Sequence, residues 1–280
     1  MTYREAVLQA SQQATARGFE SKRAEWLLTD LFEWSFTDYV MHMNEQIPDD
    51  KYALFQSAVQ RMLKGEPIQY ITGTQSFLGE KFQVDERCLI PRPETEEVFM
   101  HFQTHCKQNA VVADIGTGSG ILAVMLKLLR PDLEVYATDL YDGPLEIAQQ
   151  NAKAHHTNVT FLKGNALEPI VERNIRLDGL ISNPPYIDFA EAADMTETVL
   201  DFEPHQALFA DNQGLAVYIA IIEQLPFVMN EKSLVVFEIG YEQGTVLKAI
   251  IEDKYPHLNV EVIADINNND RIVSFYWTSK

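Results

Sequence analysis

The 280-residue sequence contains few cysteines and no long apolar run. Its two cysteines, Cys88 and Cys106, offer neither a disulfide framework nor the clustered spacing of a metal site. We therefore expect no bound metal and a reducing, cytoplasmic setting. There is no cationic start followed by an apolar stretch, and no apolar segment long enough to cross a bilayer, so we expect no membrane insertion.

Positive charge is also scarce. The chain has 22 lysines and arginines against 41 aspartates and glutamates, which gives a formal net charge of −19 at pH 7. Binding to duplex nucleic acid rests largely on basic side chains that neutralise phosphates, so this balance disfavours a nucleic-acid partner, although a local basic groove would still allow one. The charge is equally compatible with a role in solubility alone.

The tetrapeptide Asn183-Pro184-Pro185-Tyr186 is the most informative feature that is present. It follows the apolar residues 180–182, which predicts that it leaves the carboxyl end of a buried strand, where open α/β sheets place their ligand sites. The Asn oxygen and a carbonyl held by the prolines can accept both N–H bonds of a planar NH2 group, and the Tyr ring can lie against its flat face. Alternatively, the four residues form an ordinary turn, in which Asn and Pro are common.

A glycine-rich loop lies upstream of this tetrapeptide. Residues 111–115 read as a buried strand and residues 121–129 as a helix. Glycines between them let the backbone pass close to a bound molecule, which the free N–H groups of the helix start would face. The loop residues are Gly116, Thr117, Gly118, Ser119 and Gly120.

Asp114 makes this loop differ from those of dinucleotide-binding folds. The spacing Asp-x-Gly-x-Gly-x-Gly departs from G-x-G-x-x-G, which disfavours a pyrophosphate clamp. A carboxylate beside the glycines would repel phosphates but attract the amino group and sulfonium of a cofactor such as S-adenosylmethionine.

Two further strand ends carry candidate cofactor ligands. A second apolar strand over residues 135–138 ends at Asp139, where a carboxylate can accept both ribose hydroxyls of a nucleoside. The alternative for Asp139 is a helix cap or a solvated turn. Asn165 and Ala166 follow a third strand over residues 159–162 and would border the adenine.

These features, in this order and at these intervals, resemble the class I S-adenosylmethionine-dependent N-methyltransferases. The tetrapeptide is shared with DNA adenine and ribosomal RNA guanine methyltransferases, so it indicates the reaction type rather than the substrate. Four further segments resemble the bacterial peptide chain release factor glutamine methyltransferases, and the likeness runs over nearly the whole chain. They are residues 65–73 (GEPIQYITG), 89–96 (LIPRPETE), 201–204 (DFEP) and 237–240 (FEIG).

The resemblance implies methyl transfer from S-adenosylmethionine to the side-chain amide nitrogen (N5) of the glutamine in the Gly-Gly-Gln motif of release factors, which modulates translation termination. The product would be S-adenosylhomocysteine. Asn183, Pro184 and Tyr186 would be catalytic, and the whole tetrapeptide and Arg92 would bind the substrate. The cofactor would contact Asp114, residues 116–120, Asp139, Asn165, Ala166 and Asn183. Asn165 and Ala166 depart from the acidic and large residues that are common in the family.

Two alternatives remain. A nucleic-acid N-methyltransferase would present the exocyclic amino group of a flipped adenine or guanine base to the same tetrapeptide. A non-catalytic adapter would use its helical part to bind a protein and retain only a vestigial cofactor fold. The acidic composition disfavours the first, and the presence of Asp114, Asp139 and Asn183 disfavours the second. We expect a monomer.

The chain divides by pattern into three parts. Residues 1–72 predict a helical bundle for substrate recognition, in which Thr2 and Glu5 form a capping box and Ser21 caps the second helix. Residues 73–90 predict a β-hairpin linker. Residues 91–280 predict a Rossmann-like α/β methyltransferase domain with a mainly parallel sheet, and the resemblance implies seven strands with an antiparallel final pair.

Two loops near the predicted site are expected to frame it. Residues 91–94 would line the mouth of the pocket, with Arg92 ordered by a carboxylate such as Glu94 or Glu238. Residues 189–201 are acidic and lack clear periodicity, which predicts either a mobile flap or a solvated loop.

Overall fold

A computed structural model describes residues 1–279, apart from the side chains of Asp194 and Glu197. The chain forms two compact units. The first comprises Met1–Thr74 together with Thr196–Phe202. The second comprises Gln75–Met195 together with the chain from Glu203 onward.

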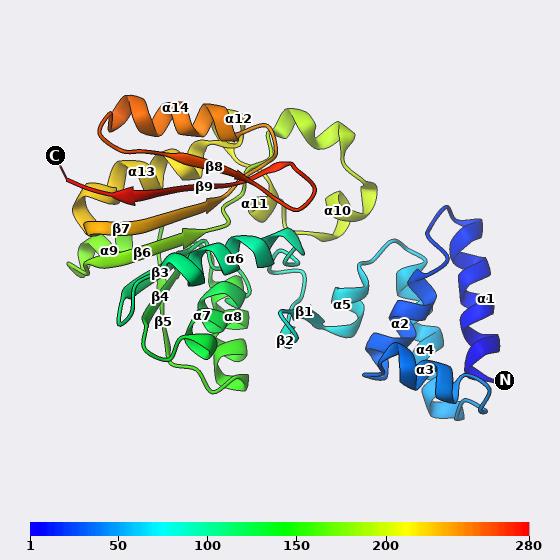
Figure 1. The fold of residues 1–280 in the computed structure, drawn as a ribbon. Coiled ribbons are helices and arrows are strands. Elements are labelled where there is room, and N and C mark those ends of the chain that lie inside the picture. Colours follow the sequence, from blue (N-terminus) through cyan, green and yellow to red (C-terminus); the bar gives the residue numbers. More distant parts are fainter. Residues whose placement is uncertain (280) are drawn as a thin grey trace. The chain divides into compact units, whose positions relative to one another are not determined.

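The first unit is a bundle of helices that begins at α1 (Tyr3–Ala16), drawn in blue in Figure 1. Thr2 and Glu5 form the predicted capping box, in which each side chain accepts from the other residue's N–H. The predicted Ser21 cap is wrong, because Lys22 precedes α2 already in α-helical geometry and without a side-chain cap. The helices that follow are α2 (Arg23–Leu31), α3 (Phe36–His42), α4 (Asp49–Met62), α5 (Ile68–Thr72) and α10 (Glu197–Phe202).

Apolar side chains at helical spacing fill the interior of this unit. Leu27, Leu28, Phe55 and Met62 have no exposed surface. Burying each side chain of this size contributes about 1.5–3 kcal/mol, so this packing rather than intrinsic helix propensity holds the short helices together. These buried side chains form the core of the unit, whereas Leu8 and Trp26, which lie in the same apolar patterns, are exposed.

The second unit is built on a seven-stranded sheet of order β5-β4-β3-β6-β7-β9-β8 (Figure 1). Strands β3 to β7 run parallel, whereas β9 runs antiparallel between β7 and β8. The predicted mainly parallel sheet with an antiparallel final pair is confirmed. The strands are β3 (Val111–Ile115), β4 (Glu134–Asp139), β5 (Val159–Lys163), β6 (Leu177–Ser182), β7 (Met229–Glu238), β8 (Glu261–Ala264) and β9 (Asp270–Trp277).

Helices cover both faces of the sheet, and the alternation of side chains along the strands explains why. Val112 packs into one apolar cluster with α6, α7 and α8, whereas Ala113 and Ile115 pack into another with α9, α13 and α14. The bounds are α6 (Glu94–His105), α7 (Ile121–Leu129), α8 (Asp142–Ala154), α9 (Glu168–Glu172), α13 (Ala216–Val228) and α14 (Gly244–Lys254).

The predicted hairpin is present as a two-stranded sheet of β1 (Thr74–Phe77) and β2 (Glu80–Gln83). Phe77 and Phe82 are buried in the cluster that contains α6 and α7. Backbone amides anchor it further, because the Gln83 N–H donates to Asn151 Oδ1 at 2.7 Å. From Gln75 onward the hairpin is therefore part of the second unit.

The segment expected to be irregular is helical along most of its length. It contains the 3₁₀ helix η1 (Phe189–Asp194) and α10, which belongs to the first unit. Two short helices, α11 (His205–Leu208) and α12 (Asp211–Gly214), follow in the second unit. These helices are too short to show a periodic pattern in the sequence, and for this reason the sequence did not predict them.

The strand register brings the candidate site together. Ile115 at the end of β3 pairs with Thr138 of β4 on one side and with Ser182 of β6 on the other. The glycine loop, Asp139 and Asn183 therefore leave three neighbouring strands at the same level. Between β3 and β6 the strand order reverses, and open α/β sheets bind their ligands at such a switch point.

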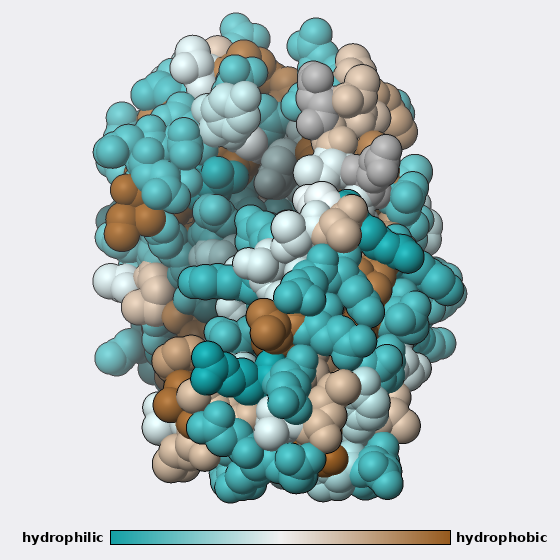
Figure 2. All heavy atoms as spheres, turned by 90° about the vertical axis from the view of Figure 1, so that its right-hand side faces the viewer, coloured by the Kyte–Doolittle hydropathy of each residue, from teal (hydrophilic) through white to brown (hydrophobic). Residues whose placement is uncertain are grey.

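The molecular surface in Figure 2 is covered mainly by hydrophilic residues, and hydrophobic side chains gather there only in small separate patches. No helix among the described residues is both long and apolar enough to span a bilayer.

Candidate active site

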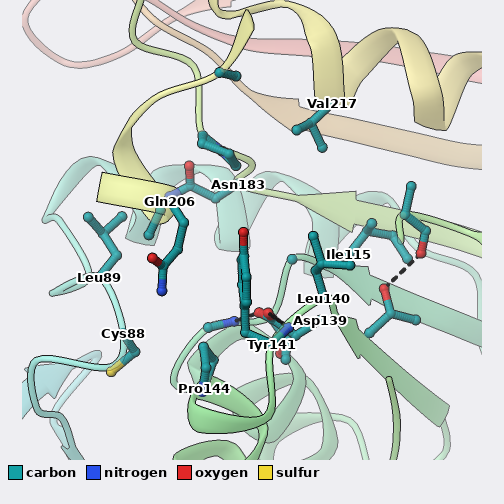
Figure 3. Close-up of a pocket in the computed structure, with 18 of the residues that line it drawn as sticks. Cys88, Leu89, Ile115, Asp139, Leu140, Tyr141, Pro144, Asn183, Gln206 and Val217 are labelled. Carbon is teal, nitrogen blue, oxygen red and sulfur yellow. Dashed lines mark hydrogen bonds between the residues drawn. The ribbon is translucent and has the colours of Figure 1, made fainter. Parts of the chain in front are cut away.

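A cavity of about 500 Å³ opens at the carboxyl ends of the parallel strands (Figure 3). Its wall contains the glycine loop, the ends of β4 and β5, the start of the tetrapeptide and residues 205–211. Cofactor and drug-sized ligand sites span about 300–1,000 Å³, so the cavity is large enough for a nucleoside cofactor.

The three loop glycines adopt positive φ angles for different reasons. Gly116 (φ 72°) and Gly118 (φ 56°) line the cavity, and a Cβ on either would meet nothing within 4 Å. Gly120 (φ 79°) packs against α8, where a Cβ would lie 2.7 Å from that of Ala148. The first two glycines thus leave room beside the backbone, and the third allows α7 and α8 to approach each other.

Asp114 lies beneath the glycine loop rather than on the cavity wall. Its side chain is fully buried, and Oδ2 accepts from Thr117 Oγ1 at 2.6 Å and from the Ala123 N–H at 3.2 Å. Burial raises the pKa of Asp114 to about 7. Its Oδ1 has no partner among residues 1–279. Asp114 thus shapes the loop from behind, and the contact predicted between its carboxylate and a cofactor stays a prediction.

Asp139 joins two loops at the cavity wall. Its Oδ2 accepts from the Gly118 N–H and its Oδ1 from the Tyr141 N–H, each at 3.0 Å. Each carboxylate oxygen has a further lone pair with which to accept another hydrogen bond. Burial raises the pKa of Asp139, while its backbone hydrogen bonds lower it. This placement supports the ribose-binding role predicted from the strand end.

The end of β5 contributes Asn165 and Ala166 to the same wall. The Thr138 hydroxyl donates to the Ala166 carbonyl at 3.0 Å and so helps to hold this segment against the end of β4. Figure 3 shows Tyr141 extending from the β4–α8 loop into the cavity toward Asn183. Tyr141 and its neighbour Leu140 were not predicted as site residues, although two apolar residues directly after a ligand-bearing strand end are a usable signal.

Asn183 lines the cavity, and its side-chain oxygen is an unpartnered acceptor that neighbouring side chains shield. Its Nδ2 donates to Thr95 Oγ1 at 3.4 Å, while its Oδ1 is shielded from solvent and has no hydrogen-bond partner in the described chain. Buried polar atoms are normally paired, so an orphaned oxygen at a cavity is a position where a ligand donor is expected. Thr95 was not predicted as a site residue.

The other residues of the tetrapeptide are held by contacts outside the cavity. Pro185 lines the cavity, whereas Pro184 is buried and Tyr186 is half-buried beside the cavity wall without being part of it. The Tyr186 carbonyl accepts from Gln243 Nε2 at 2.8 Å, and a Cβ on Gly214 would lie only 1.9 Å from that carbonyl oxygen. Burial raises the pKa of Tyr186 to about 12. The tetrapeptide is therefore a rigid strand exit.

Arg92 is paired with a carboxylate, as predicted, but the carboxylate is that of Glu203 rather than Glu94 or Glu238. Arg92 Nη2 lies 2.7 Å from Oε1 of Glu203, whereas the Glu238 carboxylate lies behind the tetrapeptide with Thr95. The reason is the fold: the chain returns at Glu203 beside the loop before α6, and sequence separation gave no sign of this. Pro91 of the same loop lines the cavity, so the loop does border its mouth.

Comparisons with known proteins decide the family. The model of the PrmC N-terminal domain matches residues 5–73, and that of the methyltransferase small domain matches residues 95–211. The release factor glutamine methyltransferase of Staphylococcus aureus is 52% identical over 277 residues, which cover 99% of this chain and 100% of that protein. This chain belongs to the release factor glutamine methyltransferase family.

A second family member, the release factor glutamine methyltransferase of Bacillus subtilis, is 38% identical and covers 96% of each chain. Among solved structures, a methyltransferase of Pyrococcus furiosus has a TM-score of 0.56 at 17% identity and covers 80% of this chain and 100% of that chain. This likeness shows the fold, which is that of the class I methyltransferases. The fold class predicted from the sequence is confirmed.

Proposed function

We propose that this family member transfers a methyl group from S-adenosylmethionine to the side-chain amide nitrogen (N5) of the glutamine in the Gly-Gly-Gln motif of peptide chain release factors. Its similarity to proteins of that activity over their full length supports the reaction and the substrate class. Within the site, the observation that carries the proposal is the buried, unpartnered Asn183 Oδ1. Leaving such an acceptor without a donor costs about 1–3 kcal/mol, which a substrate N–H would recover.

The cavity fits the cofactor in three respects. The open space beside Gly116 and Gly118 admits a ligand close to the loop backbone. The carboxylate of Asp139 has lone pairs suited to a ribose diol, and Asn165 and Ala166 border the side on which we place adenine. S-adenosylmethionine supplies, when bound, an electrophilic methyl group on a sulfonium. Asp114 is buried beneath the loop, where the effective dielectric constant is low. Its carboxylate, when ionised, therefore favours a positively charged ligand in the cavity.

The protein's task is alignment, because an amide nitrogen is a poor nucleophile whose lone pair is delocalised into the carbonyl. Asn183 Oδ1 and the Pro184 carbonyl would accept the two N–H bonds and direct the nitrogen toward the methyl group. Such alignment can lower a barrier by several kcal/mol, up to roughly 7–11 in ideal intramolecular cases. The same acceptors bind the more polarised N–H bonds of the transition state better than those of the ground state. Tyr186 would support the face of the amide.

No strong general base is needed in this scheme. The nitrogen of a methylated amide is very acidic while it carries the extra proton, so it can release that proton to water or to a nearby carbonyl. Side chains that shield Asn183 Oδ1 must shift when the substrate enters, because this oxygen has almost no contact with solvent.

Further proposals concern substrate recognition, the oligomeric state and the cellular compartment. We propose that residues 1–72 recognise the release factor, that Arg92 contributes to substrate binding through its loop, and that the enzyme acts as a monomer. Because release factors work on ribosomes, we expect it in the cytoplasm. Nucleic acid is disfavoured as a methyl acceptor by the net charge of −19.

A labelling experiment tests the proposal. The protein is incubated with S-adenosylmethionine labelled in its methyl group and, separately, with release factor, total RNA or DNA. Label in the release factor that disappears when the Gly-Gly-Gln glutamine is replaced by Ala is the expected result. Label in the nucleic acids alone would assign the chain to nucleic-acid methylation instead.

A further inference from the structure

Asn183, Thr95 and Glu238 lie together behind the cavity wall. Asn183 Nδ2 donates to Thr95 Oγ1 at 3.4 Å, and the Thr95 hydroxyl lies close enough to the Glu238 carboxylate to lower its pKa. Glu238 Oε2 is buried and has no hydrogen-bond partner among the described residues. Thr95 and Glu238 are each only 1% exposed. They come from different elements, since Thr95 lies in the first turn of α6 and Glu238 is the last residue of β7.

The sheet register explains why these elements meet. Ser182, directly before Asn183, pairs with Phe237, directly before Glu238, so both side chains leave adjacent parallel strands at the same level. The helix α6 packs against β7 and places the Thr95 side chain between those of Asn183 and Glu238. The contact is thus built by three rigid elements, which is the support that a precisely oriented side chain requires.

The chemistry of the three groups fixes the direction of each hydrogen bond. An ionised carboxylate only accepts, and a hydroxyl has a single proton to donate. When Thr95 donates that proton to Glu238, its oxygen is left as an acceptor and must face the NH2 end of Asn183. The oxygen end of the Asn183 amide is then the end that has no partner, as the structure shows.

We propose that Glu238 and Thr95 are positioning residues that determine which end of the Asn183 amide faces the substrate. The inference rests on the proposed function, because the orientation matters only if Asn183 accepts from the glutamine NH2 group. With the opposite orientation, the NH2 group of Asn183 would face the NH2 group of the substrate. Two donors would then oppose each other and the glutamine would lose its alignment.

The protonation state of Glu238 offers a direct test. Burial raises the pKa of Glu238 to about 7. The protonated carboxyl can itself donate to Thr95, which frees the hydroxyl proton for Asn183 Oδ1 and reverses the amide. The turnover number should therefore rise as pH increases through about 7. The ionisable groups near Glu238 are Arg271 and Arg92, which favour its charged form, Glu94, which opposes it, and the phenols of Tyr186 and Tyr218.

Three variants and one control test the positioning role, measured by kcat and KM for release factor and by calorimetric titration with S-adenosylmethionine. Thr95→Val removes the hydroxyl at nearly constant volume and should lower kcat about tenfold or more, since a buried hydrogen bond to Asn183 is lost. Thr95→Ser keeps the hydroxyl and should stay within about threefold of wild type. Thr104→Val is the matched control on the same helix, because its hydroxyl is at the surface and donates to the Met100 carbonyl.

The pH profile of Glu238→Gln distinguishes a positioning role from a merely structural one. Its amide oxygen can accept from Thr95, so activity at about pH 8 should largely persist, whereas the rise of kcat between about pH 6 and pH 8 should disappear. Asp114 also has a pKa raised to about 7. It is retained in this variant, and so is Asp139, whose pKa burial also raises, so kcat is measured at saturating cofactor to keep their effects on cofactor binding out of the comparison.

The outcomes distinguish the positioning role of Thr95 and Glu238 from the proposed methylation of release factor. Equal kcat for Thr95→Val and Thr95→Ser, or a wild-type kcat that is flat across this pH range, would overturn the positioning role while methylation of release factor still stood. If Thr95→Val fails to fold, the Glu238→Gln profile decides alone, and a rise identical to wild type counts against the inference. A wild-type protein that leaves release factor unlabelled would overturn the proposed function and this inference together.

Discussion

Arg92 and Glu203, which are 111 residues apart in the sequence, form an ion pair with an Nη2 to Oε1 distance of 2.7 Å. The Glu203 side chain is only 2% exposed, and its Oε2 also accepts from the Ile90 N–H at 3.3 Å. One buried carboxylate therefore ties the loop before α6 to the segment that precedes α11. The same loop leads directly into Thr95, so the ion pair stabilises the entrance to the site and the start of the helix that contacts Asn183.

Breaking this pair should destabilise the second unit. Arg92→Ala leaves the Glu203 carboxylate buried without its cation, and we expect the free energy of unfolding to fall by about 1–3 kcal/mol, discounted for the partial exposure of Arg92. Chemical denaturation measures it. Lys163→Ala, which breaks the exposed Lys163–Asp142 pair, is the control and should change stability by less than about 1 kcal/mol. Equal effects of the two substitutions would contradict the role given to Glu203.

Asn183→Ala should abolish most turnover while the fold and the affinity for cofactor largely survive, because the acceptor for the substrate N–H is lost. Asn183→Asp keeps an acceptor but adds a charge, so it should exceed Asn183→Ala only if the site tolerates a carboxylate. Single-turnover rates with release factor and circular dichroism of each variant are the measurements. Turnover near the wild-type value in Asn183→Ala would rule out the assigned role.

Asp139→Ala should weaken cofactor binding. The substitution removes the proposed ribose contacts and the bonds to the Gly118 and Tyr141 amides. Hydrogen bonds to charged groups are worth about 1.5–3 kcal/mol, so the affinity for S-adenosylmethionine should fall roughly ten- to a hundredfold by calorimetric titration. Asp142→Ala, in the exposed first turn of α8, is the control. Unchanged affinity in Asp139→Ala would refute the contact, and tight binding of NAD would indicate an oxidoreductase.

The loop glycines should respond differently to the same substitution. Gly120→Ala forces a Cβ to 2.7 Å from the Ala148 Cβ, and overpacking of this kind costs about 1–3 kcal/mol of stability. Gly118→Ala meets no atom within 4 Å but places a methyl group beside the cavity. We therefore expect Gly120→Ala mainly to lower the melting temperature and Gly118→Ala mainly to weaken cofactor binding. The reverse pattern would show that the two glycines have been assigned the wrong roles.

The acidic composition should speed encounter with a basic substrate. The glutamine-bearing domain of a release factor works against ribosomal RNA, so we expect it to be basic and attracted by a net charge of −19. Such steering weakens with salt, because the Debye length shrinks from about 10 Å at 0.1 M to about 3 Å at 1 M. The second-order rate with intact release factor should fall steeply with added salt, and that with a short neutral Gly-Gly-Gln peptide should barely change. Parallel salt curves for the two substrates would leave solubility as the sole role of the charge.

Local sequence patterns determined much of the architecture. The pattern around the glycine loop predicted β3 and α7 with their observed bounds, because an apolar run, a glycine-rich turn and a proline shortly after the helix, Pro131, are all properties of neighbouring residues. The same logic located Asp139 and Asn183 at strand ends. Since parallel strands end at one edge of a sheet, residues at those ends could be expected to share a site before any contact was known.

Only the tertiary structure decided which side chains support that site. The pairing of Arg92 with Glu203, the contact of Asn183 with Thr95 and the proximity of Glu238 depend on strand order and helix docking, which connect residues far apart in the sequence. The sequence by itself determined which acceptors and carboxylates stand at the strand ends, where we propose that they bind the ligands. Their orientation, their burial and hence their pKa values come from packing, because each depends on atoms supplied by other elements of the fold.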